Sequence, residues 1–191
     1  MKKILTRHIG KKNIYIHNDL SNAAYYFKEK IETKLKTNDL EGIIFEYMAC
    51  LIMLAFTFEA EINFLGHKLI TNWKERRPFE NKITEVFKYL KIDPDWSIRP
   101  YSSIKMIKKF RDLLAHGKPY EIEFSKKVAN KNKDIFEMIE LDSKWVSYCA
   151  HDNVFNAYSD LKIIWKELLH IAKISQFETI THSISGIISI K

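Results

Sequence analysis

The stretch IIFEYMACLIMLAFTF, residues 43–58, is the most apolar part of the chain, and its single charged residue is Glu46. Apolar side chains fall on nearly every side of a helix drawn through it, which is typical of a helix at the centre of a bundle. The stretch is shorter than the ~20 residues that a bilayer-spanning helix needs. We therefore predict a buried core helix from about residue 40 to residue 70, with Glu59 and Glu61 in its second half.

Four further segments repeat apolar residues at the spacing of helices that pack on such a core. We expect these helices at 19–36 (with 21 as an alternative start), 78–92, 102–117 and 143–174. Ser21 is a favourable N-cap, Pro78 suits a first helical turn, and either Ser102 or Ser103 can cap the helix that Gly117 ends. Only 5 Gly and 4 Pro occur, too few turn residues for a β-sandwich or barrel. The expected fold class is mainly α, a bundle of about four to five helices.

Short β elements are expected outside these helices. An alternating stretch at 120–124 and an apolar run at 135–141 flank a polar turn, which predicts a β-hairpin inserted near 120–141. Residues 1–17 would form a short hairpin or an arm, and the tail at 176–191 would add a strand or be loose. We interpret 1–191 as a single domain with an arm (1–17), helices (18–118), a hairpin (119–142), a long helix (143–175) and a tail (176–191).

Charge and composition narrow the functional classes. The chain carries 31 Lys+Arg against 24 Asp+Glu, a formal net charge of +7. This bias favours a polyanionic partner because phosphate contacts release counterions, although many basic domains bind no nucleic acid. Cys50 and Cys149 stand in apolar runs, which indicates buried free thiols in a reducing compartment. Basic residues interrupt any signal-peptide core, so we expect a cytoplasmic protein without a membrane partner. No metal-ligand spacing or Gly-rich phosphate loop occurs, and we expect no metal and no cofactor.

The helix at 102–117 ends in an unusual segment, RDLLAHG, from Arg111 to Gly117. At ~100° per residue, the apolar side chains of this helix occupy one arc. The opposite arc holds Lys105, Lys108, Lys109, Asp112 and His116. Arg111 falls at the edge of the apolar arc. Because a guanidinium keeps its charge when buried, it requires a carboxylate, a phosphate or a subunit interface.

Each polar residue of this segment also has an ordinary structural explanation. Arg111 could form an ion pair with Glu59 or Glu61 of the central helix. His116 stands in the last helical turn, where the negative end of the helix dipole favours an imidazolium. Asp112 and His116, four residues apart, could simply pair with each other. The lysines could be a solvated helix face.

Taken together, the segment resembles the motif of the HEPN superfamily. That signature is an arginine followed after four to six residues by a histidine, often with Asn, Asp or His directly after the arginine. Arg111, Asp112 and His116 match it with four intervening residues. The resemblance extends more loosely from about Leu40 to Lys118, and includes the long helix through Glu59. It implies an all-helical domain in which this motif lies near a helix end.

The resemblance also implies a chemistry. Active members are metal-independent endoribonucleases, usually dimers, in which motif residues from two subunits line one cleft. His116 would act as general acid or base, Arg111 would bind the scissile phosphate, and Asp112 would orient one of them. The placement of Glu59 in the central helix, and not the resemblance, suggests that it would support Arg111. The 2′-hydroxyl of RNA would be the nucleophile. Phosphate-tracking residues would be Lys105, Lys108, Lys109 and Lys118.

The expected biological setting is a toxin or phage-defence effector that acts on RNA as a homodimer, with a possible antitoxin or defence-system partner protein. The alternative is a non-catalytic HEPN-like binding or dimerisation module, in which Arg111 and Glu59 form a structural pair. A third possibility is an RNA binder that uses the lysine face without cleavage.

Overall fold

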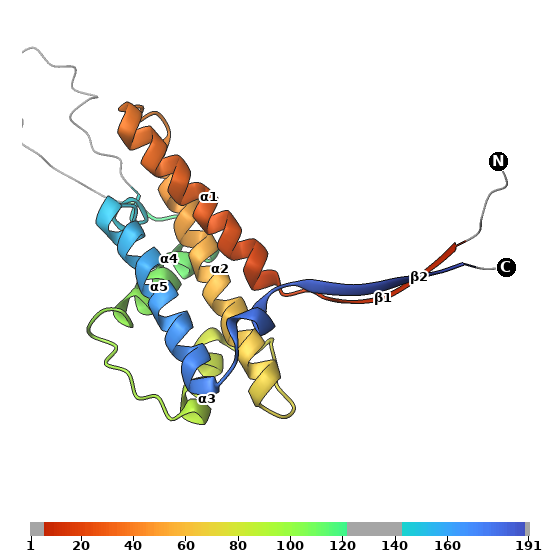
Figure 1. The fold of residues 1–191 in the computed structure, drawn as a ribbon. Helices are drawn as coiled ribbons and strands as arrows, with labels where there is room; N and C mark the ends of the chain where they lie inside the picture. The colour runs from red at the N-terminus through yellow and green to blue at the C-terminus, as the bar shows by residue number, and fades with distance from the viewer. Residues whose placement is uncertain (1–5, 122–142, 190–191) are drawn as a thin grey trace, which may run out of the picture.

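The computed structural model describes residues 6–121 and 143–189 of the chain. Within these ranges the protein is mainly helical, with five α-helices and one two-stranded antiparallel sheet (Figure 1). The expectation of a mainly α fold with four to five helices is confirmed. The helices are α1 (Ile16–Thr37), α2 (Ile43–Leu69), α3 (Phe79–Leu90), α4 (Ser102–Ala115) and α5 (His151–Ala172).

Helix α2 is the centre of the bundle, because each of the other four helices packs against it. Its side chains Leu51, Phe58, Ile62 and Leu65 are completely buried, which accounts for the apolar composition that predicted a core helix. The helix has 27 residues. Among the described residues it is the one helix that is long and apolar enough to cross a membrane, but core helices of soluble bundles can have the same length and composition.

One face of α2 departs from the prediction of a helix buried on all sides. Phe45 and Phe56 are 59% and 40% exposed, and Ile52, between them on the same face, is partly exposed. These three residues form what we call the α2 strip. These exposures show that none of the helices within residues 6–121 and 143–189 covers the strip completely.

Long-range contacts set the helix starts, and the predicted caps are wrong for this reason. Helix α1 begins at Ile16, because the His17 and Asn18 side chains each bind the Thr179 carbonyl oxygen at 3.0 Å; Ser21 lies inside the helix. In α4 the N-cap position is Tyr101, without a side-chain cap. Ser103 lies within the helix and its hydroxyl donates to Asp160 of α5 at 2.5 Å.

The last helix begins later than predicted. A 3-10 helix, η2 (Val146–Tyr148), precedes α5, which starts at His151. The Tyr148 ring packs on Phe110 with a centroid distance of 5.6 Å, and Asn153 Nδ2 donates to the Tyr148 carbonyl at 3.3 Å. These contacts turn the chain before α5.

Burial raises the pKa of Cys50 to about 12 and that of Cys149 to about 11, and both are free thiols as predicted.

The sheet joins the two ends of the described chain. Strand β1 (Thr6–Asn13) pairs with β2 (His182–Ser189) in antiparallel register, so that Asn13 lies opposite His182 and Gly10 opposite Ser185. This ribbon projects away from the helices (Figure 1). The N-terminal segment is thus an arm rather than a hairpin of its own, and the tail supplies its partner strand. The inserted hairpin predicted near 120–141 lies almost entirely outside the described residues.

Candidate functional site

Arg111 projects from α4 onto α2 and is held by two carboxylates. Its Nη1 donates to Glu59 Oε2 at 2.6 Å, and its Nε and Nη2 both donate to Asp112 Oδ1, at 3.2 and 2.9 Å. The guanidinium carbon lies 5.5 Å from the centre of the Phe79 ring. Of the two partners considered from the sequence, Glu59 is the one found. The Arg111 side chain is 21% exposed, so one edge of it reaches the surface.

Glu59 also binds a cation that sequence analysis missed. Lys82 of α3 donates to Glu59 Oε1 at 2.5 Å and to the Glu75 carbonyl at 3.0 Å. The Lys82 residue is only 1% exposed. Lysine is seldom buried unless it is paired. Lys82 lies about one helical turn after Phe79 and one before Val86, which are both buried. This spacing is the sequence signal that could have identified Lys82 as buried.

Asp112 links the same network to α3. Its Oδ2 lies 2.8 Å from the Lys108 ammonium, which also pairs with Glu80. Burial alone would raise the pKa of Asp112, but the hydrogen bonds from Lys108 and Arg111 outweigh it and lower that pKa below its ordinary value. The hydrogen bonds to Asp112 and Glu80 raise the pKa of Lys108. The Asp112 side chain therefore orients Arg111, and the pairing with His116 considered from the sequence is replaced by these contacts.

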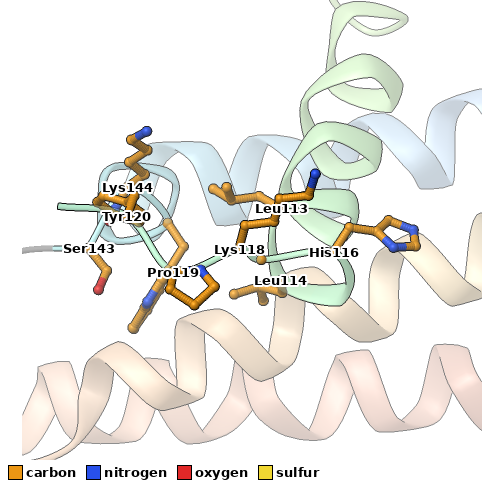
Figure 2. Close-up of a pocket in the computed structure, with 10 residues that line it drawn as sticks. Leu113, Leu114, His116, Lys118, Pro119, Tyr120, Ser143 and Lys144 are labelled. Atoms are coloured by element: carbon orange, nitrogen blue, oxygen red, sulfur yellow. The ribbon is translucent and has the colours of Figure 1, made fainter.

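His116 occupies the C-cap position of α4 and is exposed. Its backbone N–H donates to the Asp112 carbonyl at 2.9 Å. The imidazole lies at the boundary of two surface depressions, each about 410 Å³. In Figure 2 its ring points away from Tyr120 and Lys144, which line the far end of one depression. An exposed imidazole at this place can exchange protons with a bound molecule without disturbing the core.

The second depression brings the two motif residues together. It is lined by Ile52, Phe56, Arg111, Leu114, Ala115 and His116. Two residues of the α2 strip, Ile52 and Phe56, therefore line the same hollow as Arg111 and His116. Its floor is apolar, and its polar groups are contributed by the motif.

The predicted phosphate-tracking lysines do not all have the same surroundings. Lys105 and Lys109 are exposed one helical turn apart, and Lys118 is exposed beside His116. The Lys108 ammonium, in contrast, is held by Glu80 and Asp112. Lys144, which the sequence did not single out, lines the first depression together with Lys118, and its ammonium lies 4.4 Å from the centre of the Tyr120 ring (Figure 2).

Among residues 6–121 and 143–189, no group of three or more His, Cys, Asp or Glu side chains is arranged to hold a metal ion. Comparison of the chain with protein-family models, with curated protein sequences and with solved structures finds no match in any of the three.

Proposed function

We propose that the chain is a metal-independent endoribonuclease of the HEPN type. The observation that supports this most directly is that Arg111 and His116 line one surface depression at the end of α4. A guanidinium that can bind a phosphate and an imidazole that can transfer a proton are two of the groups that RNA cleavage by its own 2′-hydroxyl uses.

The chemistry follows from these groups. A base removes the 2′-hydroxyl proton, the 2′-oxygen forms a bond to phosphorus, and the bond to the 5′-oxygen breaks as that oxygen receives a proton. His116 carries one of the two proton transfers, and His116 of a second copy is the natural candidate for the other. The products are a 2′,3′-cyclic phosphate and a 5′-hydroxyl.

Arg111 binds the scissile phosphate in this proposal. A guanidinium has five N–H donors, and the Glu59 and Asp112 carboxylates accept from three of them. The remaining two can donate to a phosphate oxygen and stabilise the charge that develops there. Glu59 and Asp112 are positioning residues, because they fix the orientation of the fork.

The surroundings of the depression support RNA as substrate and a homodimer as the working form. Lys109, Lys118 and Lys144 supply exposed positive charge on the side of His116, which suits a phosphate backbone. On the other side, the α2 strip is an apolar surface of the kind that subunit interfaces cover. A second copy packed on this strip would bring two sets of motif residues to one cleft.

A non-catalytic HEPN-like module is the second candidate. It is favoured by the satisfaction of Arg111: three of its donors are engaged by carboxylates, which is sufficient to explain a guanidinium at the edge of a core. In that case the depression and the α2 strip would serve partner binding, and RNA would be bound without product or not at all.

The test is cleavage of total RNA, tRNA and synthetic strands in EDTA, with His116→Ala as the decisive variant. We expect wild-type protein to form cyclic phosphate ends and His116→Ala to lose about 10²- to 10⁴-fold in rate. His170→Ala is the matched control, since His170 is also an exposed histidine at the C-terminal end of a helix; its rate should equal the wild-type rate.

Sedimentation of Phe45→Asp, assayed for cleavage in parallel, separates dimerisation from chemistry, because Phe45 belongs to the α2 strip but does not line the depression with Arg111 and His116. We expect this variant to be monomeric and inactive. Equal cleavage by wild type and His116→Ala would contradict the assignment of His116. Absence of cleavage by folded wild type on all three substrates would favour the non-catalytic module.

A further inference from the structure

A separate cavity, distinct from the two depressions beside His116, lies on the opposite side of α2 from the Arg111 network. Glu59 and Glu61 are two residues apart, so at ~100° per residue their side chains point in roughly opposite directions. On the Glu61 side, α1, α2, α5 and the 3-10 helix η3 (Gln176–Thr179) enclose a cavity of about 400 Å³. This volume is in the range of small-molecule sites.

The inner wall of this cavity contains an unpartnered acid. Glu61 is 6% exposed, and its Oε2 atom has no hydrogen-bond partner. Burial raises the pKa of the Glu61 carboxyl well above its ordinary value, which favours the neutral form. Buried polar atoms without partners are uncommon in folded proteins and call for an explanation.

Neighbouring polar groups do not satisfy Glu61, because they have partners of their own. The Thr57 hydroxyl donates to the Met53 carbonyl at 2.7 Å. The His17 ring binds the Thr179 carbonyl through Nε2 at 3.0 Å, and burial lowers its pKa, which favours the neutral imidazole. The Glu61 carboxyl is therefore a buried polar group of this cavity that is available to a ligand.

The mouth of the cavity has the opposite charge. Lys162 and Lys166, one helical turn apart on α5, are exposed and line it. Trp165 and Tyr158 of α5 also line the cavity; Tyr158 is buried and Trp165 is partly buried. The site thus combines a buried acid, two aromatic side chains and two exposed cations.

We propose that this cavity binds a small zwitterionic molecule, with a guanidinium or ammonium head against Glu61 and a carboxylate or phosphate tail between Lys162 and Lys166. A guanidinium matches a carboxylate through paired N–H donors, and aromatic walls also attract cations. The two lysines disfavour a ligand that is a cation alone. This site is independent of the ribonuclease proposal, since it shares no residue with the depression at Arg111.

Binding of such a head should displace a proton. A neutral Glu61 carboxyl must ionise and release its proton to pair with a cation, and other titratable groups also line the cavity. These groups are His17 on α1, and Tyr158, Lys162 and Lys166 on α5; the η3 residues Gln176 and Thr179 do not titrate. The part of the proton release that Glu61→Gln abolishes therefore reports on Glu61.

Isothermal titration calorimetry of the full chain with 4-guanidinobutyrate tests the proposal. We expect one saturable site, and a measured heat that changes between two pH 7 buffers of different ionisation enthalpy because a proton is released. Butylguanidine lacks the tail and butyrate lacks the head, so each should bind at least about 10-fold more weakly. Guanidinoethyl phosphate in a parallel titration distinguishes a phosphate tail from a carboxylate tail.

Variants identify the residues. Glu61→Gln, which is nearly isosteric, should lose at least about 10-fold in affinity and all proton release, while the exposed control Glu41→Gln should bind as wild type does. Lys162→Ala with Lys166→Ala should lose the preference for guanidinobutyrate over butylguanidine without unfolding the chain. Absence of binding of either zwitterion at millimolar concentration, or equal binding by Glu61→Gln, would overturn the proposal.

Discussion

Replacement of Glu59 by alanine should destabilise the whole bundle, because one carboxylate neutralises two cations. Its Oε1 lies 2.5 Å from the Lys82 ammonium and its Oε2 lies 2.6 Å from Arg111 Nη1. Without Glu59, Arg111 keeps Asp112, but the buried ammonium of Lys82 keeps only the Glu75 carbonyl. The main cost therefore arises at Lys82.

The expected magnitude follows from burial. Removal of one partner of a buried ion pair costs about 3–5 kcal/mol. Since the Glu59 side chain is 25% exposed, water can partly replace it, and we take the lower end, about 3 kcal/mol. With a urea m-value of about 2 kcal/mol/M, the midpoint of unfolding should fall by about 1.5 M.

Two further variants make the measurement decisive. Glu59→Ala combined with Lys82→Met removes both buried charges and should return to within about 1 kcal/mol of wild type. Glu75→Ala removes an exposed side chain next to the site, but Lys82 binds the backbone of Glu75, so the midpoint should not change. A loss below about 1 kcal/mol in Glu59→Ala, or a double variant no more stable than Glu59→Ala, would refute the reasoning.

Two other predictions concern packing and pH. Gly66→Ala would place a Cβ atom 2.2–2.6 Å from atoms of the Trp73 ring. This overlap should outweigh the gain in helix propensity and lower Tm by several degrees. In the control Gly186→Ala, the added Cβ meets nothing within 4 Å, so Tm should stay unchanged. Hydrogen bonds from the cations around Asp112 outweigh its burial and lower its pKa. The stabilising contribution of Asp112 is therefore present above its ordinary pKa of 3.8, and it is lost as the pH falls through the lower pKa of the folded state. Urea titrations from about pH 5 to pH 2 should therefore show a shallower loss of unfolding free energy in Asp112→Asn than in wild type, and the same slope as wild type in the exposed control Asp152→Asn. A wild-type slope in Asp112→Asn, or unchanged Tm in Gly66→Ala, would contradict these predictions.

The sequence was sufficient for features that depend on local periodicity. The long apolar run predicted α2 as the core helix. The position of Arg111 at the edge of the apolar arc predicted a carboxylate, a phosphate or a subunit interface as its partner, and the carboxylate of Glu59 is among the partners found. Both conclusions follow from the 3.6-residue repeat and from the cost of burying a charge, which need no knowledge of tertiary contacts.

Features set by long-range contacts were not predictable in the same way. The start of α1 depends on Thr179, more than 160 positions along the chain, and β1 pairs with a strand at the other end of the sequence. Lys82 was missed for a different reason: a lysine is ordinarily assigned to the surface, and only the combination with Glu59 makes its burial favourable.

The shared carboxylate of Glu59 determines which experiment can assign the function. Glu59 binds both Arg111 and the buried Lys82. Substitutions at Arg111 or Glu59 therefore alter the folding equilibrium as well as any phosphate site. Loss of cleavage in such variants would follow from either effect. His116 has no such coupling, since it is exposed at the C-cap and its described hydrogen bond is made by the backbone, which alanine retains. A variant at His116 can therefore change proton transfer while stability stays constant. Cleavage by that variant, measured beside its unfolding midpoint, separates chemistry from structure where Arg111 cannot.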